Sequence, residues 1–295
     1  MRDLFPGFNR RRLRTGGATI HVAWGGNGPP VLLLHGYPQT HVMWHEVAPE
    51  LARGYSVVCP DLRGYGDSSK PKGLPDHSNY SKRAMANDMV ELMRALGHER
   101  FHVVGHDRGG RVAHRMARDH ASRVRTLTVL DISPTLKMYR STNMQFAKAY
   151  FHWFFLIQEA PLPERMLEGQ GPFYLLRRLG RGKAGLKFFA KEALAEYERA
   201  FRDPRTVHAT CEDYRAAATI DLVHDQRDRA KIRMPVLALW GKQGVIGALF
   251  DCLADWREVA TDVRGRALSC GHFIAEEKPK DLLAELRRFL PKAEA

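Results

Sequence analysis

The stretch GHDRGGR at residues 105–111 follows the short apolar run FHVV and precedes RVAHRMARDH, which has the pattern of a helix. Two glycines flank the aspartate Asp107 in the order glycine–x–acid–x–glycine. A sharp turn from strand to helix holds its central side chain over the edge of a sheet, and glycines let the backbone of the turn approach its neighbours closely. The short pattern alone is weak, but its position between a strand and a helix predicts a nucleophile elbow.

The segments around this turn alternate between strand-like and helix-like patterns. Short continuous apolar runs are typical of strands covered on both faces, as in a parallel sheet. A helix is predicted over 80–96, where methionines and leucines share one face and Gly97 follows as a stop signal. The predicted strands are Ala18–Trp24, Pro30–Leu34, Ser56–Pro60, Phe101–Gly105, Arg125–Asp131, Met234–Trp240 and Gly265–Cys270, and the last predicted helix is Lys280–Leu290.

The alternation breaks between about residues 133 and 218, a segment that is rich in aromatic and arginine side chains and looks helical. We therefore predict a protein of the α/β class, with a mostly parallel sheet flanked by helices and an inserted helical cap. The expected division is a first core part over 1–134, the cap over 135–218 and a second core part over 219–295.

The composition limits the classes of function. The chain has 295 residues, 44% hydrophobic and 27% charged, which is typical of a soluble globular protein. Its longest apolar runs are too short to span a bilayer, and the N-terminus lacks a signal-peptide core, so we expect a cytoplasmic protein without a membrane partner.

The net charge of +13 is spread along the chain without a nucleic-acid-binding signature, so we expect no nucleic-acid partner but a small anionic one. Four scattered cysteines without a CxxC pair predict free thiols and no metal site.

A catalytic triad can be assembled around the elbow in the chain order nucleophile, acid, histidine. His272, in the stretch CGHF, follows the last predicted strand. The turn after Trp240 contains no carboxylate, whereas Asp131 follows the preceding strand, so elimination favours Asp131 as the acid. The backbone N–H groups of Tyr37 and Arg108 are the expected oxyanion hole. The alternative for Asp131 is a structural role at the strand end.

An aspartate nucleophile changes the expected reaction. A carboxylate is suited to displacement at a saturated carbon, which forms an ester between enzyme and substrate, and this makes ordinary esterase activity improbable. Arg108 and Arg111 lie three residues apart and can face one pocket. Guanidinium groups match the two oxygens of a carboxylate, so the pair predicts a carboxylate beside the reacting carbon. The competing interpretation is a surface row of arginines that continues through Arg115 and Arg118.

The sequence resembles the fluoroacetate and haloacetate dehalogenases of the α/β-hydrolase fold over nearly its whole length. The resemblance implies Asp107 as nucleophile, Asp131 and His272 as its triad partners, and Arg108 and Arg111 as the carboxylate clamp. The motifs that carry it are LLLHGYPQTHVMWHEVAP at 32–49, DLRGYGDSSKP at 61–71, GHDRGGR at 105–111, LDISPT at 130–135, HW at 152–153, CEDYRA at 211–216 and SCGHF at 269–273.

The resemblance also implies a halide pocket formed by His152, Trp153 and Tyr214, whose N–H and O–H groups can stabilise a leaving halide. From the residues alone, an aromatic cap helix packed on the core is the more economical interpretation of His152 and Trp153. The resemblance implies a homodimer and no cofactor. Two departures from the family pattern are Tyr37, where phenylalanine is usual, and Gly182, near which a cap tryptophan is usual.

Four other functions compete with a dehalogenase that accepts fluoroacetate. One is a chloro- or bromoacetate dehalogenase with poor defluorination. An epoxide hydrolase would share the triad and use cap tyrosines as acids, but the two arginines argue against it. A haloalkane dehalogenase resembles G-x-D-W-G, with tryptophan where this chain has Arg108. A receptor on the same fold would not need the complete set Asp107, Asp131 and His272.

Overall fold

The computed structural model describes residues 3–181 and 185–291. Its centre is an eight-stranded sheet with the strand order β1-β2-β4-β3-β5-β6-β7-β8. The pairs β1–β2 and β2–β4 are antiparallel, and the remaining pairs are parallel. The strands are β1 (Asn9–Arg14), β2 (Thr19–Gly25), β3 (Pro30–Leu34), β4 (Ser56–Pro60), β5 (Phe101–His106), β6 (Val124–Leu130), β7 (Val236–Gly241) and β8 (Val263–Leu268).

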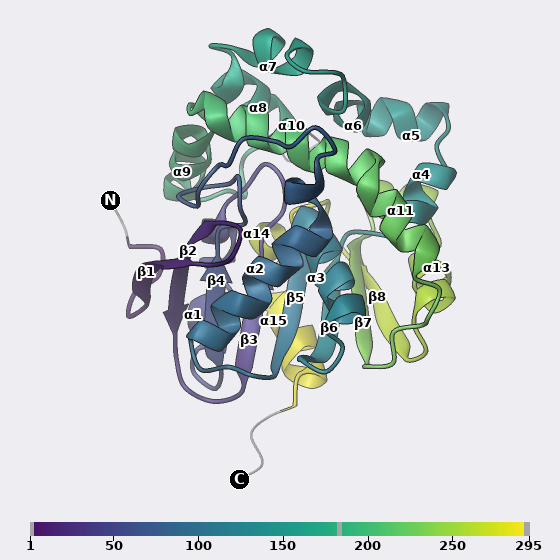
Figure 1. The fold of residues 1–295 in the computed structure, drawn as a ribbon. Helices are drawn as coiled ribbons and strands as arrows, with labels where there is room; N and C mark the ends of the chain where they lie inside the picture. Colours follow the sequence, from purple (N-terminus) through teal and green to yellow (C-terminus); the bar gives the residue numbers. More distant parts are fainter. Residues whose placement is uncertain (1–2, 182–184, 292–295) are drawn as a thin grey trace.

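The central strands are buried along their length because helices cover both faces of the sheet. In Figure 1, α2 and α3 cover the face turned toward the viewer, and α15 lies behind the strands. Helices of the core are α1 (Ala48–Leu51), α2 (Lys82–Ala95), α3 (Arg108–Asp119), α12 (Val245–Leu249), α13 (Cys252–Val259), α14 (Ile274–Glu277) and α15 (Pro279–Phe289), with short 3-10 helices at η1 (His41–Trp44) and η2 (Ser78–Tyr80). The predicted fold class is confirmed.

A run of helices separates β6 from β7 and lies together at one end of the sheet, at the top of Figure 1. We call α4–α10 the cap; α11 continues the helical run before β7. These helices are α4 (Thr135–Arg140), α5 (Met144–Ala149), α6 (Phe151–Leu156), α7 (Leu162–Leu167), α8 (Gly171–Leu179), α9 (Lys191–Phe201), α10 (Pro204–Ala218) and α11 (Ile220–Arg227).

Strand register brings the loops that matter for function to the same edge. Leu34 of β3 pairs with Gly105 of β5, and Gly105 pairs with Val129 of β6. Because parallel strands end at the same side of a sheet, the loops that follow β3, β5 and β6 meet there, beneath the cap.

The sequence pattern does not predict strand β1. Its sequence NRRRLR has no apolar alternation, and five of its six side chains are exposed. It forms because its backbone pairs with β2 from Asn9–Trp24 to Arg14–Thr19 at the sheet edge. A strand held mainly by backbone hydrogen bonds cannot be detected from hydrophobic periodicity.

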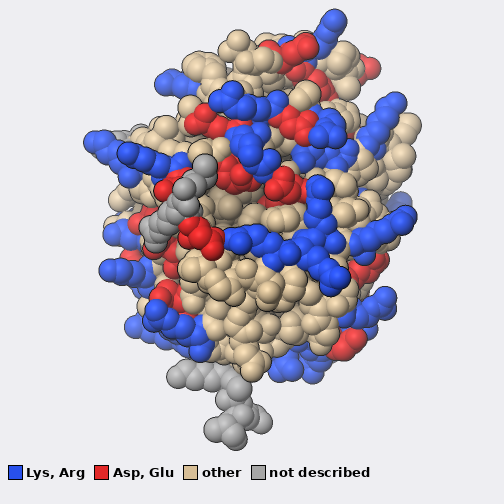
Figure 2. All heavy atoms as spheres, turned by 90° about the vertical axis from the view of Figure 1, so that its left-hand side faces the viewer, with Lys and Arg blue, Asp and Glu red and all other residues tan. Residues whose placement is uncertain are grey.

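Basic side chains on the face drawn in Figure 2 are spread over both the cap and the core, with acidic side chains among them. This face therefore presents a mixed surface rather than one continuous basic stripe. Within 3–181 and 185–291, none of the helices is both long and apolar enough to cross a membrane.

Candidate active site

Asp107 lies at the turn between β5 and α3, as the glycine pattern predicts. Its backbone has φ 45° and ψ −114°, a region that non-glycine residues rarely adopt and that stores strain. A Cβ atom at Gly105 would lie 2.5 Å from the carbonyl oxygen of Gly109, and one at Gly109 would lie 2.4 Å from that of His35. The two glycines are therefore required by close backbone contacts on either side of the aspartate.

The Asp107 carboxyl group is buried, with 5% of the residue exposed. The backbone N–H of Tyr37 donates a hydrogen bond of 2.9 Å to its Oδ1. Burial acts to raise the pKa of this carboxyl, but the positive charges of the surrounding histidines and arginines, first among them His272, lower it below its usual value. The Asp107 carboxyl group is thus an anion. Its Oδ1 accepts from the Tyr37 amide, and its Oδ2 can act as the nucleophile.

Asp131 and His272 form a tight pair. His272 Nδ1 lies 2.5 Å from Oδ2 of Asp131, and the N–H of Gly241 donates to Oδ1 at 2.9 Å. Burial acts to lower the pKa of His272, but the hydrogen bond and charge of Asp131, with the charge of Asp107, raise it above its usual value. The imidazole is therefore oriented by Asp131, with its Nε2 edge free for a proton.

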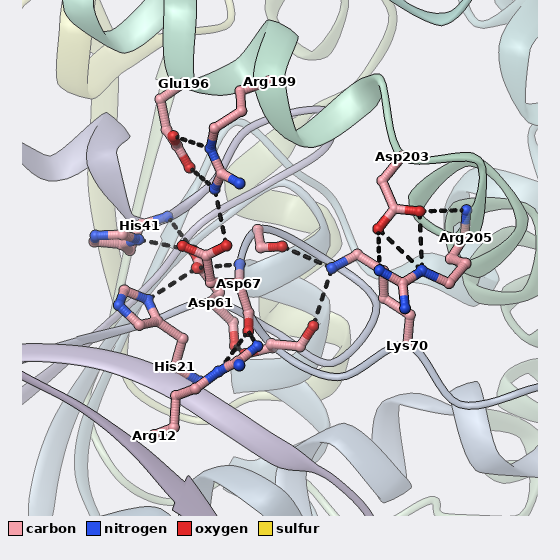
Figure 3. A network of polar contacts seen from close by, with 12 residues as sticks. Arg12, His21, His41, Asp61, Asp67, Lys70, Glu196, Arg199, Asp203 and Arg205 are labelled. Carbon is pink, nitrogen blue, oxygen red and sulfur yellow. Dashed lines mark hydrogen bonds and ion pairs between the residues drawn. The ribbon is translucent and has the colours of Figure 1, made fainter.

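The loop that carries the Tyr37 amide continues to His41, which is bound by the carboxylate of Asp61 after β4; Figure 3 shows Asp61 with His41 and His21. Asp61 accepts from the N–H and the Nδ1 of His41, both at 2.8 Å, from His21 Nδ1 at 3.1 Å and from the N–H of Asp67 at 3.0 Å. His21, His41 and Asp61 together have the composition of a cation site. However, four N–H donors already satisfy the oxygens of the Asp61 carboxylate. The cluster fixes the loop that supplies one expected oxyanion donor.

Arg108 differs from the expectation of a free cation. It is fully buried, and its guanidinium donates to both carboxylate oxygens of Asp213, at 2.7 and 2.8 Å, and to the carbonyl of the same residue. Asp213 also forms a buried ion pair with Lys82 and accepts from Tyr65 at 2.7 Å. The surface-row interpretation is therefore wrong for Arg108. Its charge is compensated by this chain, and Nη1 is the one guanidinium nitrogen without a hydrogen bond among the described residues.

Arg111 is also buried, but it makes no ion pair with a carboxylate in the described part of the chain. Its Nη1 donates to Thr135 Oγ1 at 2.9 Å, its Nη2 lies 3.2 Å from Met138 sulfur, and its guanidinium carbon lies 4.8 Å from the centre of the Trp153 ring. The charge of nearby Asp107 raises the pKa of Arg111, while burial, the larger effect, lowers it. Arg111 is therefore a buried cation whose charge can pair with an external anion.

The cap places His152, Trp153 and Tyr214 together. The ring of Tyr214 lies 5.7 Å from that of His152 and 6.4 Å from that of Trp153, and Arg108 lies 4.1 Å from the centre of the Tyr214 ring. All three side chains are buried, and within the described residues His152 Nδ1, Trp153 Nε1 and Tyr214 Oη have no hydrogen-bond partner. A buried polar atom without a partner is costly, so a cluster of three donors indicates a place for an acceptor.

Tyr37 enters the same cluster with its side chain. Its ring is stacked on that of His152 at 5.8 Å and meets the ring of Tyr214 edge-on at 5.2 Å. Burial, together with the neighbouring Tyr174 and Tyr214, raises the pKa of Tyr37 well above its usual value, so the hydroxyl stays protonated. The second departure noted in the sequence, Gly182, lies outside the described residues.

A separate hollow of about 810 Å³ opens in the cap between α7, α8, α9 and α10. Phe201 lines it, and the ring of Phe201 lies edge-on to that of Tyr37 at 6.0 Å. The residues that line the hollow include none of the candidate catalytic residues. It is a feature of the cap surface and not the reaction site.

Two functional candidates were missed in the sequence. Asp213 lies in the stretch CEDYRA, so its position next to Tyr214 was a usable signal, but its partner Arg108 is 105 residues away. Arg178 of α8 lies 3.2 Å from His152 through Nη2 and Nε2, and no sequence pattern links the two. The cysteines agree with expectation, because all four are free and buried.

Comparisons with known proteins agree with this architecture. Residues 29–279 match the family described as the alpha/beta hydrolase fold. A fluoroacetate dehalogenase from Burkholderia sp is 48% identical, over 98% of this chain and 96% of the relative. A soluble epoxide hydrolase from Corynebacterium sp. (strain C12) is 35% identical, over 92% of this chain and 94% of that protein.

A crystal structure of a protein from Nostoc sp PCC 7120 assigned to the alpha/beta hydrolases superposes with a TM-score of 0.94 and 55% identity, covering 97% of this chain and 98% of that one. The chain therefore belongs to the α/β-hydrolase fold family. The resemblance to the dehalogenases of this family is confirmed, and so is the expectation that the chain is a hydrolase.

Proposed function

We propose that the protein hydrolyses the carbon–halogen bond of a small 2-halo carboxylic acid, with a haloacetate, fluoroacetate included, converted to glycolate and halide. The 48% identical relative is a fluoroacetate dehalogenase, which supports this reaction class. The proposed partner of the protein is this small anionic substrate.

In the first step, Oδ2 of Asp107 attacks the carbon that bears the halogen. A carbon–oxygen bond forms, the carbon–halogen bond breaks, and the halogen leaves as an anion with the bonding electrons. The substrate carboxylate is held by Arg111 and by the remaining Nη1 donor of Arg108. The leaving halide receives hydrogen bonds from His152, Trp153 and Tyr214, which lower the barrier most for the poor leaving group fluoride.

In the second step, His272 takes a proton from water, and the resulting hydroxide attacks the carboxyl carbon of the Asp107 ester. The amides of Tyr37 and Arg108 stabilise the oxyanion that forms. When it collapses, the bond from the Asp107 carboxyl carbon to the former Oδ2, which is now bound to the substrate carbon, breaks, and His272 returns the proton to the departing alkoxide. Asp107 is left as a carboxylic acid and loses its proton to solvent, which restores the carboxylate. The overall reaction consumes haloacetate and water and releases glycolate, halide and one proton.

The observation that carries this proposal is an anionic aspartate near a buried cation, beside three neutral donors; in the described residues the cation has no carboxylate partner and the donors have no acceptor. Asp107 supplies a nucleophile, Arg111 requires an anion, and the cap donors require an acceptor. An α-halo acid offers a carboxylate and a halogen on adjacent atoms, which satisfies all three.

Release of halide from fluoro-, chloro- and bromoacetate tests the proposal, with an ion-selective electrode or ion chromatography as the readout. We expect release from all three substrates without added metal or cofactor. Absence of release from all three would refute the reaction. Release of chloride and bromide without fluoride would refute the assignment of the three cap donors.

An epoxide hydrolase is the second candidate, because the Corynebacterium relative is a soluble epoxide hydrolase and Tyr214 places a buried hydroxyl near Asp107, with no hydrogen-bond partner in residues 3–181 and 185–291. A neutral epoxide leaves the charge of Arg111 uncompensated, whereas a halo acid does not. Diol formation from styrene oxide, measured beside halide release from bromoacetate, distinguishes the two functions.

The loss of activity at low pH should follow the protonation of His272. The base must be neutral to activate the water that hydrolyses the ester, so kcat should fall as the pH drops through a midpoint above the usual pKa of histidine. Asp131→Asn removes the charge that raises this pKa, and we expect the midpoint to move to lower pH. The His272 pKa measured by NMR titration of both forms is the check; an unchanged midpoint in Asp131→Asn would contradict the assignment.

Arg111→Gln should weaken substrate binding. Hydrogen bonds to charged groups contribute about 1.5–3 kcal/mol, so we expect KM for bromoacetate to rise roughly 10- to 100-fold. Arg118→Gln is the matched control, because it removes the same charge from the same helix but its side chain contacts His114 and the carbonyls of Asp228 and Ala230. A similar rise in KM for both variants would show that only the general positive field matters.

A further inference from the structure

Arg178 projects from α8 toward the cap cluster formed by His152, Trp153 and Tyr214. Its Nη2 lies 3.2 Å from Nε2 of His152, while its Nε and Nη1 are buried without a hydrogen-bond partner among the described residues. Over the same residues, no carboxylate lies within ion-pair distance of its guanidinium. Its one polar side-chain contact is therefore with His152.

This contact determines which nitrogen of His152 carries the proton. A guanidinium group has donors and no acceptor, so His152 Nε2 must accept through its lone pair. Burial lowers the pKa of His152 well below its usual value, and the charges of Arg178 and Arg181 lower it further. The ring is therefore neutral, and its single proton is on Nδ1.

Nδ1 is the nitrogen of His152 that has no partner in the described part of the chain. The ring of His152 is fixed between the stacked Tyr37 ring and the edge-on Tyr214 ring, at 5.8 and 5.7 Å. With the proton on Nδ1, this atom becomes a donor and joins Trp153 Nε1 and Tyr214 Oη. With the proton on Nε2, it would present a lone pair and repel an anion.

We propose that Arg178 is a positioning residue for the dehalogenation reaction, which holds His152 as the Nδ1–H tautomer so that its free nitrogen donates to the leaving halide. The role of His152 toward the halide rests on the proposed function. The assignment of the Nδ1–H tautomer does not, because it follows from the contact between Arg178 and His152.

The first test reads the tautomer directly and needs no turnover. Long-range nitrogen–proton NMR spectra of the uniformly nitrogen-15-labelled protein distinguish a protonated Nδ1 from a protonated Nε2, and the His152→Gln spectrum assigns the signals of His152. We expect Nδ1–H in the parent protein and a shift toward Nε2–H in Arg178→Met. An Nε2–H form in the parent protein, or identical signals in the two proteins, would overturn the proposal.

The second test compares fluoride with bromide release. Fluoride needs hydrogen-bond donors more than bromide does, so Arg178→Met should lower the fluoride rate about 10- to 100-fold relative to the bromide rate. Arg178→Lys, which still donates, should recover most of the ratio. Arg177→Met is the control, because Arg177 is exposed on the same helix and its removal should leave the ratio unchanged.

The outcomes separate this inference from the proposed function. If the parent protein releases none of the halides, the reaction is wrong and the tautomer result stands by itself. If halide is released and the tautomer shifts in Arg178→Met but the fluoride-to-bromide ratio does not, Arg178 does not act through the halide.

Discussion

Asp107→Asn is expected to abolish halide release from every haloacetate. An amide oxygen is a far poorer nucleophile than a carboxylate. Loss of a catalytic nucleophile typically lowers kcat by about 10⁴-fold or more. Ion chromatography of halide over long incubations measures the loss.

Arg111 and the cap donors remain in Asp107→Asn, so binding of bromoacetate should persist, which calorimetry can show. A loss of binding together with turnover would indicate a distorted site. Halide release that persists above a tenth of the parent rate would contradict covalent catalysis by Asp107.

His272→Gln should convert the enzyme into a single-turnover reagent. The first step does not need a base, because Asp107 is already an anion, but hydrolysis of the ester needs water activated by His272. We expect one equivalent of halide per chain and then a halt, with kcat lowered by about 10⁴-fold or more. Intact-protein mass spectrometry should show the added carboxymethyl group, and peptide fragmentation should locate it on Asp107.

Asp107→Asn/His272→Gln provides the control for this trap, since it should release no halide and gain no mass. A modified group at any residue other than Asp107, or continued turnover in His272→Gln, would contradict the two-step scheme.

The local part of the site could be predicted from the sequence because its signals are local. The elbow requires glycines within two residues of Asp107, and these are visible as letters in 105–111. Strands β3 and β4 begin and end where their apolar runs do, because both faces of each strand are buried. Chain order then pointed to His272 and Asp131, which the structure places 2.5 Å apart.

Contacts between distant segments could not be predicted in this way. The sequence predicts that both arginines of the elbow bind the substrate carboxylate, but the structure pairs Arg108 with Asp213. Of the two, Arg111 is the one without a carboxylate partner among the described residues. The cap helices show the same limit: from the residues alone, His152 and Trp153 were better explained as packing. Their donors become significant only because they are buried together and have no hydrogen-bond partner in the part of the chain that the structure describes.

The fold class, the elbow and the kind of reaction that an aspartate at the elbow can perform are readable from the amino-acid sequence. These follow from backbone geometry and side-chain chemistry within a few residues. Which charges are compensated and which donors are free, in contrast, is a property of the folded chain. Those properties depend on every group within hydrogen-bond reach, and in this fold such groups come from the loop after β3 and from α3, α6, α8 and α10, which are separated in the chain.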